Sequence, residues 1–144
     1  MTRLPTRLEN FLANLDLLTD RADRIEALID IAERFQEVSP EVARRPFPEE
    51  NRVPACESEA FAFVTDHPDG TLGVHFAVEN PQGISAKALA VILKEGLEGE
   101  APAVMAVVPR EVVYRIFGRE LSMGKSMGLT GMVGLLQSFA HRRL

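Results

Sequence analysis

Hydrophobic residues at helical spacing open the chain and predict a short amphipathic helix. They recur at steps of three and four, as Leu8, Phe11, Leu12 and Leu15. Thr6 lies just before this stripe and Glu9 lies three residues later, which is the spacing of a capping box at a helix start.

A second helical pattern begins near Thr19 or Asp20. Its apolar stripe is Ala22, Ile25, Leu28, Ile29, Ala32 and Phe35. Because only Leu17, Leu18 and Thr19 join the two patterns, we expect the helices to form an antiparallel pair.

The periodic pattern stops between residues 37 and 55. This segment holds scattered charges and four prolines, Pro40, Pro46, Pro48 and Pro54. A loop of this length is uncommon within a compact domain, and such loops are often functional. The alternative is a plain connector that covers an edge of the sheet.

Two strand patterns follow and predict a hairpin. The run from Ala60 to Val64 is apolar throughout, which favours a strand buried on both faces. Asp69-Gly70 marks a turn with a loop of about four residues. The return strand alternates, with Leu72, Val74, Phe76 and Val78 on one side and Thr71, Gly73, His75 and Ala77 on the other.

Helical patterns fill the rest of the chain. Ser85 is expected as the N-cap of a helix that runs to about Glu95 and ends at Gly96, with Ile84 and Leu89 as a hydrophobic staple. A short helix or turn over 101–107, a helix over 110–117 that ends at Gly118, and a last helix that begins near Ser122 are expected next. This order predicts an α+β fold in one domain, 1–144, with a small antiparallel sheet packed against several helices.

Composition narrows the class of protein. The 144 residues are 46% hydrophobic and 26% charged, as in an ordinary globular protein that can bury a core. A net charge of −5 argues against nucleic acid or an anionic membrane as the main partner. The N-terminus, beginning Met1-Thr2-Arg3, lacks the apolar core of a signal peptide, and the longest apolar runs are too short to cross a bilayer. We therefore expect a cytoplasmic protein.

Cys56 is the only cysteine, and it lies where the proline-bearing segment meets the first strand. One cysteine forms no intramolecular disulfide and supplies too few ligands for a zinc or iron–sulfur site. Lone cysteines are commonly inert and buried, but this position favours a reachable, reactive thiol. Glu57 and Glu59 place two carboxylates beside it, and we expect them to slow its reaction with electrophiles unless Arg52 offsets them.

Other candidate chemistry is weaker. Gly124-Lys125-Ser126 resembles the end of a phosphate-binding loop, but five residues separate Gly118 from Gly124 where four are required, and a helical pattern precedes them. The three histidines, His67, His75 and His141, have no metal-ligand spacing. A dyad of Cys56 with His75 is conceivable, but counting across the hairpin places His75 nearer Phe61 or Ala62.

Three glycines, Gly128, Gly131 and Gly134, interrupt the last helix. Each costs about 1 kcal/mol relative to alanine in a helix interior, so we expect another backbone to pack closely there. Either the Cys56 segment or a partner could supply that backbone, or the glycines could serve plain helix packing in the core.

The stretch Asn51-Arg52-Val53-Pro54-Ala55-Cys56-Glu57-Ser58-Glu59-Ala60-Phe61 is similar to the SufE family signature Val-x-Gly-Cys-Gln-Ser-Gln, which precedes an aromatic-containing strand. Leu121-Ser122-Met123-Gly124-Lys125-Ser126-Met127-Gly128-Leu129 resembles the family's second block, Leu-x-x-x-Arg-x-x-Gly-Leu. The segment 84–89 resembles the intervening Lys-Gly-Leu helix, so the resemblance covers nearly the whole chain. The chain departs from these patterns in having Ala55 for glycine, Glu57 and Glu59 for glutamine, and Lys125 for arginine.

This resemblance implies a SufE/IscU-like α+β fold and a sulfur acceptor. Cys56 would take persulfide sulfur from a SufS-type, pyridoxal-phosphate-dependent cysteine desulfurase, and Lys125 would have a docking or charge role. No cofactor would be bound, because the sulfur is carried covalently on Cys56 toward an iron–sulfur scaffold, by a monomer or homodimer. The alternatives are a thiol enzyme, such as a cysteine hydrolase or thiol peroxidase, and an interaction module with a structural cysteine.

Overall fold

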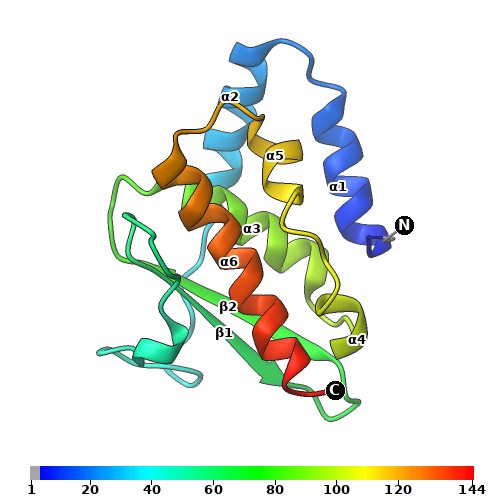
Figure 1. The fold of residues 1–144 in the computed structure, drawn as a ribbon, viewed down its shortest axis with the longest axis vertical. Coiled ribbons are helices and arrows are strands. Elements are labelled where there is room, and N and C mark those ends of the chain that lie inside the picture. Colours follow the sequence, from blue (N-terminus) through cyan, green and yellow to red (C-terminus); the bar gives the residue numbers. More distant parts are fainter. Residues whose placement is uncertain (1–3) are drawn as a thin grey trace.

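The structure is a computed structural model that describes residues 4–144 (Figure 1). Met1–Arg3, on which part of the N-terminal prediction rests, lie outside the described residues. In chain order the elements are α1 (Thr6–Asp16), α2 (Arg21–Ala32), the 3-10 turn η1 (Glu49–Asn51), β1 (Ala60–Asp66), β2 (Leu72–Val78), α3 (Ile84–Leu97), α4 (Pro102–Met105), α5 (Val112–Phe117) and α6 (Met123–His141). The α+β fold with a small antiparallel sheet is confirmed. Within residues 4–144, no helix is long and apolar enough to cross a membrane.

The hairpin buries both of its faces, as its hydrophobic pattern predicts. β1 and β2 pair antiparallel from Ala60 opposite Val78 to Asp66 opposite Leu72. The alternating side chains of β2 (Leu72, Val74, Phe76 and Val78) join the main core. The opposite face carries Phe61 and Phe63, which pack with Phe47 of the long loop at ring separations of 5.1 and 5.3 Å. The loop after α2 therefore serves as a cover for the sheet. The connection spans residues 67–71, one residue longer than expected, with Gly70 at a φ of +88°.

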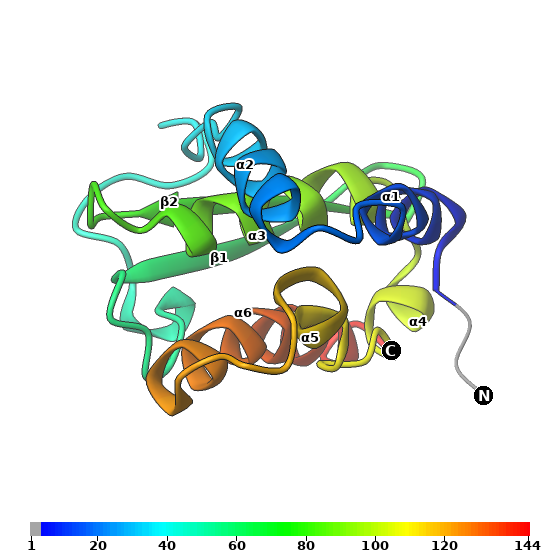
Figure 2. The same cartoon turned by 90° about the horizontal axis from the view of Figure 1, so that it is seen from above.

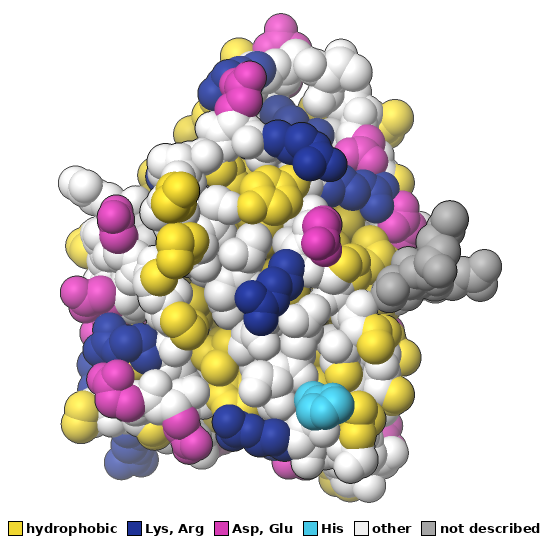
Figure 3. All heavy atoms as spheres, in the orientation of Figure 1, with side chains coloured by type: hydrophobic (Ala, Val, Ile, Leu, Met, Phe, Trp, Pro, Cys, Tyr) yellow, Lys and Arg dark blue, Asp and Glu magenta, His cyan; other side chains and the backbone are white. Residues whose placement is uncertain are grey.

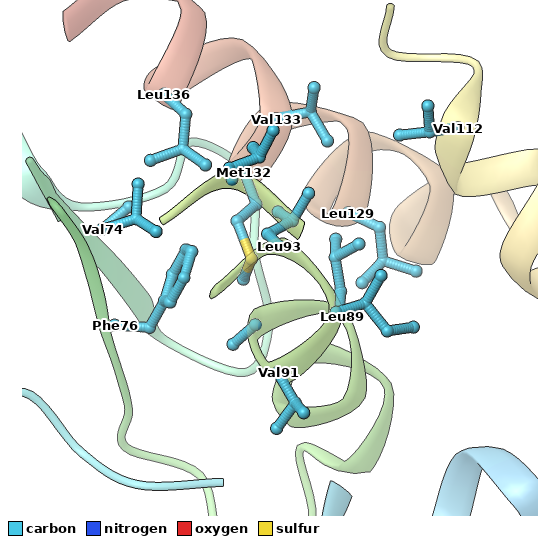
Figure 4. Close-up of a cluster of buried hydrophobic side chains, with 14 of the residues drawn as sticks. Val74, Phe76, Leu89, Val91, Leu93, Val112, Leu129, Met132, Val133 and Leu136 are labelled. Atoms are coloured by element: carbon cyan, nitrogen blue, oxygen red, sulfur yellow. The ribbon is translucent and has the colours of Figure 1, made fainter. Parts of the chain in front are cut away.

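α3 is the central helix of the core. Its residues 88–93 are all buried, and Figure 4 shows Leu89 and Leu93 facing Met132 of α6, with Val74 and Phe76 pointing into the same cluster from β2. Full burial of a large aliphatic side chain contributes about 1.5–3 kcal/mol. Seen from above, α5 and α6 lie to one side of the layer that α3 forms with the hairpin (Figure 2).

α1 and α2 run antiparallel, as expected, but each packs on α3 more than on its neighbour (Figure 1). The predicted stripe of α2 is partly wrong, because Ile25 and Ile29 remain 49% and 41% exposed. Arg24 occupies the inward position instead. Its guanidinium donates to the carbonyl of Leu15 at 2.8 Å and to that of Ile116 at 3.1 Å, at the C-terminal ends of α1 and α5. Cations at helix C-termini are favoured by the helix dipole.

Three predicted helix ends differ from the structure. Pro5 is the N-cap of α1, and Glu9 reaches Arg115 of α5 at 2.8 Å instead of completing a capping box. α3 begins at Ile84 with Gly83 as its N-cap, so Ser85 is already helical.

Gly96 lies inside α3 rather than after it, because its missing side chain makes room for α1. A Cβ there would sit 2.8 Å from the Cβ of Leu8. By contrast, the end of α5 at Gly118, with a φ of +86°, and the N-cap at Ser122 agree with the sequence.

Candidate functional site

Cys56 lies in a tight loop, residues 53–60, which we call the thiol loop. Its ends are joined by a hydrogen bond from the Val53 amide to the Ala60 carbonyl at 2.9 Å. Within it, the Glu59 amide donates to the Cys56 carbonyl at 3.1 Å. The turn after β2 also binds the loop, since the Asn80 amide donates to the Ser58 carbonyl at 3.1 Å. These bonds fix the position of the thiol between the sheet and the helices.

Two residues of the thiol loop have left-handed backbone conformations. Ala55, directly before the cysteine, has a φ of 56°, and Glu59 has a φ of 52°. A side chain makes this region unfavourable by about 1–2 kcal/mol, whereas glycine adopts it freely. Ala55 stands where the SufE pattern has glycine, so the conformation explains why glycine suits that position.

The glycines of α6 let the thiol loop lie directly on the helix. A Cβ at Gly128 would sit 3.1 Å from the Cα of Cys56, and one at Gly131 would sit 3.2 Å from the Pro54 carbonyl oxygen. The expectation of a closely packed backbone is confirmed at these two positions, and the thiol loop supplies it. At Gly134 the space is taken by the guanidinium of Arg110 instead.

The partly buried thiol opens into a cavity of ≈ 320 Å³, which we call the thiol cavity. Its walls come from the thiol loop, the turn after β2, the first turn of α3 and the first two turns of α6. The lining residues are Cys56, Glu57, Ser58, Asn80, Gln82, Gly83, Ile84, Ser85, Ala86, Gly124, Lys125, Gly128 and Leu129. The structure therefore brings Cys56 and Lys125, the two candidate site residues, to one cavity.

The turn at residues 79–83 is a wall that sequence reasoning missed. Its Gln82 amide donates to the Asn80 side chain at 2.9 Å, which fixes an Asx turn. A Cβ at Gly83 would come within 3.0 Å of Ser58, so this glycine also admits the thiol loop. The Asn80-Pro81 step and Gly83 were available signals for a tight turn, but nothing in the sequence placed that turn against Cys56.

Charges of both signs surround the thiol. α3 and α6 both begin at the cavity, and their partly positive N-termini favour an anion there. Lys125 is exposed, and its side chain forms no ion pair within residues 4–144. Glu57 and Glu59 are exposed and likewise unpaired in the described part of the chain. Arg52 does not offset them by direct contact.

Arg52 is engaged elsewhere. Its Nε donates to Glu49 at 3.2 Å, and its guanidinium lies 4.9 Å from the centre of the Phe61 ring. The two carboxylates of the thiol loop thus keep their charge available to solvent or to a partner.

The structure excludes a dyad between Cys56 and His75. His75 pairs with Phe63 in the sheet, one to two residues from the position that residue counting gave. It hydrogen-bonds Thr65 at 3.0 Å and lines a different cavity of ≈ 380 Å³ between the segment 34–39 after α2, β2 and α3. Burial and the nearby ammonium of Lys94 lower the pKa of His75 below its usual value.

The remaining candidate residues do not form a site. His67 pairs with Glu98 at 2.7 Å, and His141 lies at the far end of α6. Within residues 4–144, no group of three His, Cys, Asp or Glu side chains is placed to hold a metal ion. The segment before Gly118 is the helix α5, so it lacks the strand that a phosphate-binding loop follows.

Fold and site together define a small α+β protein that presents one thiol, held in a braced loop, to a polar cavity. Residues 9–140 match the family model described as "SufE: Fe-S metabolism associated domain". The chain therefore belongs to the SufE family, as its motifs predict.

A solved structure supports the fold. The solution structure of a hypothetical protein from Thermus thermophilus superposes with a TM-score of 0.72 at 24% sequence identity, over 98% of each chain. A search of curated proteins gives no match to this chain.

Proposed function

We propose that the protein accepts persulfide sulfur on Cys56 from a SufS-type cysteine desulfurase and carries it toward an iron–sulfur scaffold. The observation that carries this proposal is the setting of the thiol. Cys56 is partly exposed at a cavity in a loop braced by α6 and the sheet, within a chain whose family is associated with Fe-S metabolism. A protein donor can thus reach the thiol, and the persulfide formed on Cys56 can lie in the thiol cavity.

The reaction is an exchange between sulfur atoms. The Cys56 thiolate attacks the terminal sulfur of the donor persulfide, the donor's S–S bond breaks, and the donor cysteine leaves as a thiolate. Cys56 then carries the terminal sulfur as a persulfide. One S–S bond forms and one breaks, so the step needs no external oxidant or reductant. The pyridoxal phosphate that releases sulfur from cysteine belongs to the desulfurase.

The residues around the cavity suit an anionic product. The N-termini of α3 and α6 and the ammonium of Lys125 favour negative charge on sulfur. Gly128 keeps the wall beside Cys56 free of side-chain atoms. In this proposal the cavity also holds the extra sulfur atom away from solutes that would reduce it. The proposal includes a cytoplasmic location and a monomeric or homodimeric state.

The first prediction concerns Cys56→Ser. Incubation with a SufS-type desulfurase, pyridoxal phosphate and free cysteine should raise the intact mass of the wild-type protein by whole sulfur atoms. The serine variant should fold normally and gain none, because a hydroxyl cannot hold a persulfide.

Intact-mass measurement and thermal unfolding check both halves of this expectation. Equal sulfur gain by the variant would show that Cys56 is not the sulfur acceptor. Loss of its cooperative unfolding would show that Cys56 serves the fold. A hydrolase or peroxidase would instead turn over without any desulfurase, and an interaction module would bind partners while gaining no sulfur.

A further inference from the structure

We propose that the surface around Cys56 docks onto a basic partner surface, with Glu57 and Glu59 meeting lysine or arginine side chains of the partner. This proposal rests on the proposed function in that the partner is the desulfurase that donates sulfur. We call the surface formed by Glu57, Glu59, Ile84, Met123 and Met127 the docking face.

Exposed apolar side chains surround the thiol cavity. Met123 is 79% exposed, Met127 is 53% exposed and Ile84 is 45% exposed. Ile84 lines the cavity, and the two methionines lie next to its lining residues Gly124 and Gly128. Figure 3 shows hydrophobic side chains gathered over α6 and the segment beside it. An apolar centre with charges at its rim is typical of a protein–protein interface, and methionine adapts its shape to a partner.

The two carboxylates on this face have no ion-pair partner in the described part of the chain, and what distinguishes them from other unpaired surface carboxylates is their place beside the thiol. Elsewhere, carboxylates such as Glu9, Glu37 and Asp66 are paired with arginines of the same chain. Glu57 and Glu59 form no such pair within residues 4–144, although both are exposed beside the thiol. A complementary cation on a partner would satisfy them, and would speed association and exclude partners of the wrong charge.

Lys125 and the N-termini of α3 and α6 also face the cavity. Glu57 lines the same cavity from the thiol loop, whereas Glu59 lies outside the lining. The cavity therefore has positive groups on its α3 and α6 walls and negative groups on the thiol loop. A partner that delivers an anionic persulfide from a cationic surface would complement both sets of charges.

A second copy of this chain is a poorer occupant. In a two-fold interface the same patch meets itself, so Glu57 and Glu59 of one copy would approach the same two carboxylates of the other. Like charges brought together in this way are unfavourable, and the chain already carries a net charge of −5. A basic, different protein is thus favoured over self-association through this face.

The test compares the variant Glu57→Gln with Glu59→Gln against the wild type in sulfur uptake from the desulfurase. At an ionic strength of about 0.01 M, where screening is weak, we expect the double variant to have a roughly tenfold lower second-order rate constant. At about 1 M the two proteins should agree within about twofold. The variant Glu57→Asp with Glu59→Asp keeps both charges and should retain most of the rate.

A matched control is Glu26→Gln with Glu33→Gln, which removes the same charge from exposed positions on and after α2. It should behave as the wild type. Equal rates for the thiol-loop variant and this control would overturn the proposal. So would a faster thiol-loop variant, since the two carboxylates would then hinder the transfer and not promote it.

Charged disulfides separate this proposal from the proposed function. The dication cystamine and the dianion dithiodipropionate react with Cys56 without any desulfurase. At low ionic strength, we expect the ratio of the cystamine rate to the dithiodipropionate rate to be about tenfold higher in the wild type than in the double glutamine variant. No difference would overturn the charge proposal even if sulfur uptake is normal. Absence of sulfur uptake by the wild type would overturn the proposed function and the proposal that rests on it.

Discussion

Cys56 is positioned by backbone conformations that its neighbours adopt only under strain. Ala55 has a φ of 56° immediately before the thiol, and the loop closes through Val53 and Ala60 on either side. The closed loop and the helix beneath it hold Ala55 in this conformation. A residue with a methyl side chain therefore stores a small amount of unfavourable energy next to the reactive atom.

We predict that Ala55→Gly stabilises the protein by about 0.5–1 kcal/mol, because glycine relieves the strain but gains flexibility in the unfolded chain. Urea unfolding measures this difference. The contrasting control is Ala13→Gly on the exposed side of α1, which should destabilise by about 1 kcal/mol, as glycine does in a helix interior. A loss of stability in both variants would show that Ala55 is not strained.

Among the helices and strands, α6 contributes most to the site. It supplies Gly124, Lys125 and Gly128 to the cavity, and Gly131 supports the loop from below. Ser122 caps the helix by accepting a hydrogen bond from the Lys125 amide at 3.2 Å. This cap fixes where the first turn begins and hence where the lysine lies relative to Cys56.

We predict that Lys125→Ala slows sulfur uptake by about threefold to tenfold, since a cation near the reacting sulfurs is removed. Stability should stay equal or rise slightly, because a positive charge in the first turn of a helix opposes the dipole. Steady-state uptake and thermal unfolding check the two parts. Lys87→Ala in α3 is the control, since Lys87 does not line the cavity. Unchanged uptake with lower stability would assign the lysine to the fold.

Several of these elements could be predicted from the sequence because their local pattern has one reading. The alternation of β2 identifies its core face, and the glycines of α6 indicate a close backbone contact, which Gly128 makes with Cys56. Gly96 has two readings, as a helix end or as a contact point, and only the approach of Leu8 decides between them. The inward position of Arg24 likewise depends on carbonyls distant in sequence, which no local period reveals.

The same limit applies to the site. Cys56 and Lys125 could be singled out by their residue types and by family resemblance, but the turn containing Asn80 enters the cavity through tertiary packing. Counting along the hairpin misses the register of His75 by one to two residues, but it correctly predicts that His75 does not reach Cys56.

Across the whole molecule, polar networks join segments that are distant in the chain. Glu98, just after α3, accepts hydrogen bonds from the Val74 amide at 3.0 Å, from Lys94 at 2.9 Å and from His67 at 2.7 Å. This carboxylate thus ties the hairpin to the central helix. In a separate ion pair, Arg143 donates to Asp66 at 2.7 Å and joins the end of α6 to β1.

These contacts make stability depend on pH. Burial raises the pKa of Glu98, but the hydrogen bonds from Val74, Lys94 and His67 outweigh it and lower the pKa from 4.5 to about 2. Hydrogen bonds from Arg115 and Arg143 lower the pKa of Glu9 and of Asp66. A carboxyl group whose pKa is lower in the folded state stabilises the fold above its unfolded pKa, and that contribution is lost as pH falls toward the folded pKa.

We therefore predict that the free energy of unfolding falls steadily between pH 4.5 and about 2, as Glu98 and the other paired carboxylates take up protons. Glu98→Gln should lower stability at neutral pH, because it removes the charge that Lys94 meets, and should flatten the acid limb. Urea unfolding at a series of pH values measures both effects. The control Glu26→Gln removes an exposed carboxylate that forms no ion pair within residues 4–144, so it should leave the limb unchanged. An acid limb as steep in Glu98→Gln as in the wild type would show that the link between hairpin and α3 does not depend on this carboxylate.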